Sequence, residues 1–166
     1  MSQANIEKQM DEVFVKKAPF QIPANGRKAL VSWLPYLALI FGILSILALI
    51  GLWNAGHTVN EAVRTLNEIS AAYGVETATA QLGAVYYISL AAVATQAVLL
   101  LVAYPGLKSK SKSRGWNLLL YGVVASLAYG ILVAFTSYGG GADLVGSVIG
   151  AIIGLYILAQ IRSYYR

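Results

Sequence analysis

Polar side chains inside the long apolar stretches of this chain are the residues whose chemistry needs explaining first. Gln96 lies in the middle of one such stretch, and its amide needs hydrogen-bonding partners if the surroundings are apolar. Thr95 precedes it, and Ser89 lies about two helical turns earlier. We expect Gln96 to form a hydrogen bond between helices. The alternative is that Gln96, Thr95 and Ser89 contact a ligand or line a pore.

The ionisable residues do not form a catalytic or metal-binding pattern. His57 is the single histidine and there is no cysteine, so thiolate chemistry, Cys-based zinc sites and bis-histidine haem ligation are excluded. Glu61 and Glu68 share a helix face with Arg64 between them, which is typical of a surface salt-bridge ladder. We therefore predict that the protein is not an enzyme and that it holds no cofactor and no metal.

Four uncharged stretches must position the polar residues. The chain is 58% hydrophobic and only 11% charged, whereas soluble domains carry about 25% charged residues. A helix needs roughly 20 apolar residues to cross the ~30 Å hydrocarbon core of a bilayer. The stretches predict four transmembrane helices, over about residues 33–53, 82–104, 116–136 and 144–161.

The predicted fold is an all-α integral membrane protein, a four-helix transmembrane bundle made of two antiparallel hairpins. Residues 1–28 form an N-terminal segment and residues 29–166 the four-span domain. Residues 54–79 form an outer amphipathic segment, which either continues the first span or is a separate surface helix. Residues 105–115 are expected to be a short, flexible, basic loop in the cytoplasm.

The N-terminal segment has helical spacing from Asn5 to Lys17, with Ile6, Met10, Val13 and Phe14 on one stripe. We expect a short amphipathic helix that lies on the cytoplasmic surface of the membrane. Two alternatives are open: the helix docks another protein, or it folds back against its own bundle.

The distribution of charge predicts the topology. Eleven of the twelve Lys and Arg residues flank the spans on one side, and Arg64 alone lies on the other. By the positive-inside rule both termini are cytoplasmic. A net charge of +5 is explained by this rule, so nucleic-acid binding is not expected. The basic residues expected to contact anionic lipid headgroups are Lys16, Lys17, Arg27, Lys28, Lys108, Lys110, Lys112 and Arg114.

Small and aromatic residues have positions that indicate how the helices pack and where the bilayer ends. Glycine or serine at every fourth position lets two helix backbones approach closely. These residues are Gly122, Ser126 and Gly130 in the third span, and Gly146, Gly150 and Gly154 in the fourth. The two stripes are expected to pack against each other within the chain, or one of them faces a second subunit. The aromatic anchors expected at the membrane interfaces are Trp33, Trp53, Trp116 and Tyr104.

These patterns favour a small non-enzymatic membrane protein, a structural, assembly or accessory subunit that acts through its helix faces and its basic cytoplasmic surface. Its expected partners are the lipid bilayer, anionic headgroups, and another membrane protein or further copies of itself. The alternative function is a small oligomeric channel or facilitator with a polar lumen.

Overall fold

The computed structural model describes residues 12–18, 20–74, 82–136 and 141–165 together with Asn5 and Gln9, apart from the side chain of Asp143. Every regular element within these residues is a helix. The long helices are α2 (Ala24–Ala72), α3 (Ala84–Lys108), α4 (Asn117–Ala134) and α5 (Gly141–Ile161). Three single-turn helices, η1 (Glu12–Lys16), η2 (Lys112–Trp116) and η3 (Arg162–Tyr164), lie between or beside them.

Four helical segments are long and apolar enough to cross a membrane: Ala24–Ala72, Ala84–Lys108, Lys112–Ala134 and Leu144–Tyr164. Large apolar side chains on them point outward, such as Leu47 and Ile153, which are 58% and 54% exposed. A continuous apolar surface of this kind is unfavourable in water but is solvated by hydrocarbon chains. The chain therefore has the helices of a multi-pass membrane protein.

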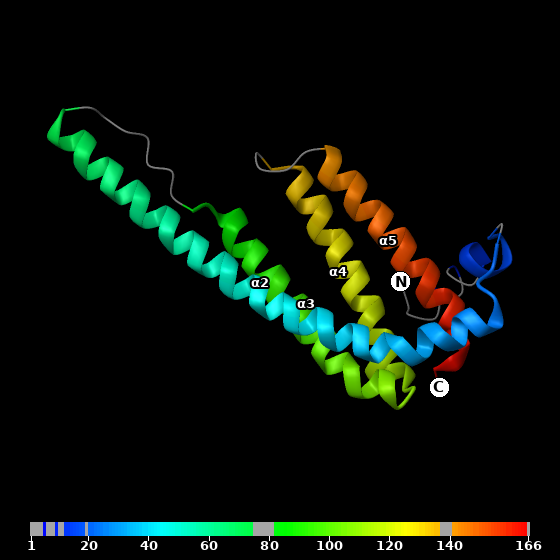
Figure 1. The fold of residues 1–166 in the computed structure, drawn as a ribbon. Coiled ribbons are helices and arrows are strands. Elements are labelled where there is room, and N and C mark those ends of the chain that lie inside the picture. The colour runs from blue at the N-terminus through cyan, green and yellow to red at the C-terminus, as the bar shows by residue number, and fades with distance from the viewer. Residues whose placement is uncertain are drawn as a thin grey trace.

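The long helices pack as two hairpins. α2 lies against α3, α4 lies against α5, and contacts between α3 and α4 join the hairpins (Figure 1). The close approach of α2 and α3 is visible at Gly42, where an added Cβ would lie 2.8 Å from Leu101 Cδ2. The prediction of an all-helical bundle of two hairpins is confirmed.

Helix α2 is much longer than a membrane span. Its 49 residues extend about 73 Å, more than twice the ~30 Å hydrocarbon core. Figure 1 shows its far end projecting well beyond the ends of α4 and α5. Residues 54–72, here called the outer extension, thus continue the first span, which was one of the two predicted alternatives. Residues 75–79 of the predicted outer segment lie outside the described residues.

The prediction that the second span ends at Tyr104 and is followed by a flexible loop is wrong. α3 continues through Pro105 to Lys108, and its last turn accommodates a residue that lacks a backbone N–H. Beyond it the backbone N–H of Ser111 donates to the carbonyl of Gly106 at 2.8 Å. The chain then enters η2, so much of the predicted loop is regular, hydrogen-bonded structure.

Two glycines make this turn compact. A Cβ on Gly106 would overlap the backbone carbonyl of Arg114, and a Cβ on Gly115 would lie 2.6 Å from the backbone nitrogen of Leu107. The end of α3 and the η2 turn can therefore touch backbone to backbone, and η2 packs beside α3 instead of extending away from it. The hydropathy of the sequence does not predict this backbone contact. A glycine at the end of an apolar stretch is instead interpreted as the end of a helix.

The buried core of the described residues lies at one end of the bundle. It joins the beginning of α2, the end of α3, η2 with the beginning of α4, and the end of α5. Trp116, Leu107 and Ile161 are its largest fully buried side chains. We call this the basic end, because η1, η2 and η3 bring Lys16, Lys112 and Arg162 to it.

Trp116 is the side chain that links the two halves of this core. Its indole Nε1–H donates to the carbonyl of Leu158 at 2.8 Å, so the start of α4 is tied to the end of α5. The sequence suggested an interface anchor here, but Trp116 is 0% exposed and does not face lipid. The compact turn before it directs the indole into the protein.

The described part of the N-terminal segment folds back onto the bundle, which was one of the three readings of its sequence. Phe14 and Val15 pack against the core, and the Phe14 carbonyl accepts a hydrogen bond from Gln160 Nε2 at 2.8 Å. The Phe20 carbonyl accepts one from the Tyr156 hydroxyl at 3.0 Å. Of the predicted apolar stripe, Phe14 packs against the core and Val13 is 51% exposed, while Ile6 and Met10 lie outside the described residues.

Replacing Trp116 with phenylalanine should lower the free energy of unfolding by about 1–3 kcal/mol, because it removes the hydrogen bond to Leu158 and part of a fully buried side chain. Denaturant unfolding in detergent measures this value. Trp33→Phe is the matched control, since Trp33 is 66% exposed and its replacement should change stability by no more than about 0.5 kcal/mol. Equal effects of the two substitutions would contradict the assignment of Trp116 to the core.

Candidate functional site

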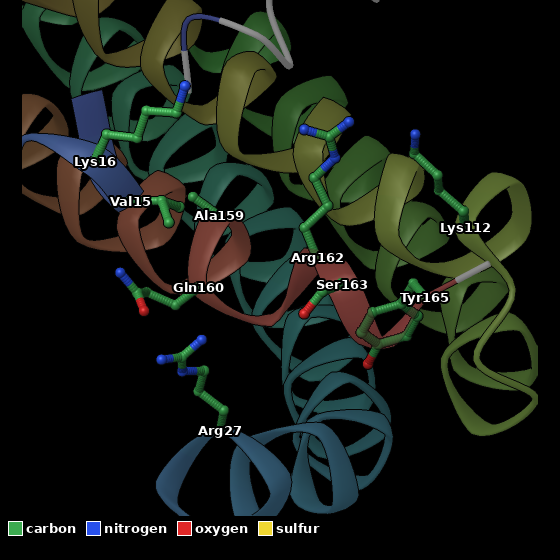
Figure 2. A pocket seen from close by; sticks show the side chains of 9 residues that line it. All are labelled: Val15, Lys16, Arg27, Lys112, Ala159, Gln160, Arg162, Ser163 and Tyr165. Atoms are coloured by element: carbon green, nitrogen blue, oxygen red, sulfur yellow. The ribbon is translucent and has the colours of Figure 1, made fainter. Parts of the chain in front are cut away.

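A cavity at the basic end collects cationic side chains from four separate parts of the chain. It encloses about 560 Å³. We call it the basic pocket (Figure 2); its lining residues are Val15, Lys16, Arg27, Lys112, Ala159, Gln160, Arg162, Ser163 and Tyr165. The four cations come from η1, the first turn of α2, η2 and η3. Helix packing therefore brings together charges that are as far apart as 146 positions in the sequence.

Two of the cations are held in place by contacts with their own surroundings. Arg27 Nε donates to the carbonyl of Ile22 at 2.7 Å, and its terminal nitrogen lies 3.4 Å from Gln21 Oε1. The guanidinium of Arg162 lies 5.9 Å from the ring centre of Trp116, a cation–π arrangement. These contacts fix the stems of both residues at the pocket.

Polar groups without partners accompany the cations. Gln160 is only 2% exposed, and although its Nε2 is bonded to Phe14, its Oε1 has no hydrogen-bond partner among the described residues. The hydroxyl of Tyr165 is likewise buried without a partner, and burial raises the pKa of Tyr165 to about 12. A buried polar atom without a hydrogen bond costs roughly 1–3 kcal/mol.

The basic residues that were predicted to meet lipid do not all come together. Lys16, Arg27 and Lys112 line the pocket, whereas Lys17 forms an ion pair with Glu12 at 2.9 Å. The others are not among its lining residues: Lys28, Lys108, Lys110 and Arg114. Sequence reasoning counted Arg162 only as a topological charge and did not connect Gln160, Ser163 or Tyr165 with any site. The usable signal was a glutamine close to the end of the last span, Gln160, two residues before the cation Arg162.

The polar residues within the spans pair with one another across α3 and α4. Ser126 Oγ lies 3.3 Å from Gln96 Oε1, and the hydroxyl of Tyr129 donates to Ser89 Oγ at 2.7 Å. Thr95 instead donates to the carbonyl of Ala91 in its own helix at 2.8 Å. A cavity of about 310 Å³ lies beside Gln96, Ser126 and Tyr129. Tyr129 was not anticipated, since a tyrosine in an apolar run gives no sign that its hydroxyl will find a partner.

The two small-residue stripes do not pack face to face. Gly122 lies opposite Gln96 of α3, at 3.5 Å from an added Cβ. Gly130 meets the side chain of Ser147, and Gly154 meets Val123 at 3.0 Å, so these two glycines do mark close contacts between α4 and α5. A Cβ on Gly146 or Gly150 would meet nothing within 4 Å.

The aromatic residues expected at the interfaces have different surroundings. Trp33 and Trp53 are 66% and 51% exposed and lie on one helix about 30 Å apart, as a pair of interface anchors would. Trp53 also contacts His57 edge to face, with ring centres 4.9 Å apart. Tyr104 is half-buried near the end of α3.

No group of three or more His, Cys, Asp or Glu side chains that could hold a metal ion occurs among the described residues. On the outer extension Arg64 Nε contacts Glu68 Oε1 at 2.9 Å, an exposed helical ion pair. Comparison with protein-family models, with curated proteins and with solved structures finds no match for this chain.

A matched pair of glycine substitutions tests the packing of α4 against α5. Gly130→Ala should lower the free energy of unfolding by about 1–3 kcal/mol, because the new methyl group would overlap the side chain of Ser147. Gly146→Ala should leave stability unchanged or raise it by up to about 1 kcal/mol, since its Cβ meets only open space and alanine favours helix. Thermal unfolding in detergent compares them, and a reversed order would contradict this packing.

Tyr165 should make stability depend on alkaline pH. Its pKa is about 12 in the folded protein against 10.0 when unperturbed, so the folded state holds the phenolic proton more tightly. Its contribution to stability is therefore complete below pH 10.0 and is lost as the pH rises toward about 12. Tyr165→Phe should remove this part of the alkaline loss, measured as the difference from wild type in unfolding free energy. Tyr73→Phe, at an 81% exposed position, should not.

Proposed function

We propose that this protein is a small non-enzymatic membrane protein, a structural, assembly or accessory subunit that acts through its helix faces and through the surface at its basic end. Both termini lie in the cytoplasm, in keeping with the excess of Lys and Arg on that side of the spans. Support for a non-enzymatic role comes from the spans themselves, in which the polar side chains bond to one another or to backbone.

The observation that carries the proposal is an apolar stripe on the outer extension. Val59, Leu66 and Ile69 are 47%, 60% and 51% exposed, and with Ala62 they recur at intervals of three and four residues. Apolar residues repeated at these intervals form the contact surface of coiled coils, in which two helices pack side by side. The hydrocarbon core is only ~30 Å thick, and the outer extension lies beyond the part of α2 that can cross it. Contact with lipid therefore does not explain why these apolar side chains are exposed.

A second copy of the same helix suits this stripe. The charged residues Glu61, Arg64 and Glu68 lie on the other side of the extension, so two stripes can meet without opposing like charges. Arg64 and Glu68 already neutralise each other within one helix. We therefore assign the stripe to self-association, and the accessory role to an assembly built on it.

A second open face supports assembly within the membrane. Gly146 and Gly150 lie on the exposed side of α5, where an added Cβ would meet nothing. Small residues four apart allow another helix to approach closely in lipid. The alternative of a channel has less support, because Gln96, Ser126, Ser89 and Tyr129 are used in contacts between α3 and α4.

The mass of the purified protein in mild detergent tests the proposal. Wild type should be a dimer or a larger assembly, and Leu66→Gln combined with Ile69→Gln should weaken association about 100-fold or more, because apolar contact area is lost from both copies. Light scattering over a dilution series measures the mass and the dissociation constant.

The matched control is Arg64→Gln combined with Glu68→Gln, which places the same residue type twice on the opposite face. It should associate like wild type. A wild-type protein that is monomeric throughout the series, or a control that dissociates as readily as the stripe variant, would refute self-association through the outer extension. A closed assembly that also conducts ions in planar bilayers would support the channel instead.

A further inference from the structure

The side-chain amide of Gln96 is only partly used by the contacts between α3 and α4. Its Oε1 accepts a hydrogen bond from Ser126 Oγ at 3.3 Å, whereas its Nε2 donates to no atom of the described residues. The nearby hydroxyls donate elsewhere, that of Thr95 to its own helix and that of Tyr129 to Ser89. Within the part of the chain that the structure describes, the two N–H groups of this amide therefore lack an acceptor.

The depth of Gln96 in the membrane makes these two donors unfavourable. It is the thirteenth of the 25 residues of α3, and Ser126 is the tenth of the 18 residues of α4. Both lie near the middle of the hydrocarbon core, where there is no water to accept from an unpaired N–H group. The ester carbonyls of phospholipids lie outside this core, about 15 Å or more from its middle. An acceptor for Gln96 therefore has to come from a molecule that enters the middle of the membrane.

Two cavities have Gln96 as a shared lining residue. The larger encloses about 310 Å³ between α3 and α4, with small and polar side chains such as Ala92, Ala125 and Tyr129 around it. The smaller encloses about 200 Å³, and its other lining residues are apolar and come from all four long helices. Ala125 and Ser126 are exposed, so the larger cavity opens on the surface that faces lipid. Mostly apolar walls with a few polar groups, at about this volume, are typical of small-molecule sites.

We propose that the cavity between α3 and α4 binds an uncharged, largely apolar molecule that carries an acceptor oxygen, to which Gln96 Nε2 donates. The lining residues carry no charge, and an ionic group without a counter-ion is unfavourable at this depth. A carbonyl is the simplest acceptor of this kind, because it brings no donor of its own into the hydrocarbon.

A second copy of the chain is the other possible source of an acceptor. A helix of that copy presents a convex surface, which would cover the opening of the cavity without filling its interior. The cavity therefore favours a small molecule over a helix. The site lies within the spans and is separate from the outer extension, so its test does not depend on self-association.

Benzophenone is the probe, because it is an uncharged ketone that attaches to nearby C–H groups when it is irradiated. The full-length protein is irradiated with it in lipid nanodiscs, and peptide mass spectrometry locates the labelled residues. Labelling is expected within residues 92–96 and 125–129. 9-Fluorenone and fluorene, which share a ring skeleton and differ in the carbonyl, then compete with the probe. Fluorenone should protect at an about threefold to tenfold lower ratio to lipid, the value of one hydrogen bond.

Two substitutions with two matched controls locate the site. Gln96→Leu should lower labelling about threefold or more and should abolish the preference for fluorenone, because the donor is lost. Ala125→Phe should lower labelling by obstructing the cavity, and its exposed position keeps the protein folded. Ser45→Ala removes a hydroxyl that donates within α2, and Ala48→Phe adds the same phenyl group at an exposed position of α2. Neither control lies at the cavity, so each should change labelling less than about twofold.

Each result decides the proposal. Labelling confined to the two segments, a preference for fluorenone that Gln96→Leu abolishes, and unchanged labelling of both controls support it. Labelling spread evenly over the spans would overturn it in favour of simple partitioning into lipid. Equal protection of the wild type by fluorene and fluorenone would overturn the hydrogen bond from Gln96. An unlabelled cavity would also overturn it, and dissociation of the copies by Gln96→Leu would then assign the amide to a contact between them.

Discussion

The hydrogen bond between the Trp116 indole and the Leu158 carbonyl supports much of what is specific in this structure. Within an apolar bundle a single polar contact fixes depth and rotation, because the surrounding dispersion contacts change little when helices slide. This contact sets the start of α4 against the end of α5. Arg162 then lies over the same indole, and Gln160, two residues past Leu158, reaches the backbone of Phe14. The basic pocket is therefore a product of helix register.

The distribution of hydropathy and charge was sufficient to predict the class of fold, because a span must be long, apolar and free of charge whatever its neighbours are. It was insufficient for the ends of the helices. α2 continues past Trp53 although Gly56 lies in this stretch, and α3 continues through Pro105 to Lys108 although proline removes one backbone N–H donor. Both are matters of local backbone geometry, to which a pattern of apolar residues is insensitive.

The candidate site was predictable only in part, for a related reason. Charges near span ends could be assigned to one side of a membrane, but not to one cavity, because grouping them requires the rotation of each helix about its axis. Lys16 and Lys17 illustrate this: neighbours in sequence, they separate into a pocket residue and the partner of Glu12. In lipid every face of a span is apolar, so hydropathy does not indicate which face meets protein. The glycine stripes show the same limit, with Gly130 in contact and Gly146 open.

The continuity of α2 has a mechanical consequence. Arg27 and Leu66 lie on one uninterrupted helix, about 58 Å apart along its axis. Between these two positions the helix is held against α3, with Gly42 close to Leu101 and the Tyr86 hydroxyl donating to the carbonyl of Leu52 at 2.9 Å. Rotation of α2 about its axis would break these contacts. The outer extension is therefore held at a fixed rotation relative to the bundle, so its apolar stripe faces one direction.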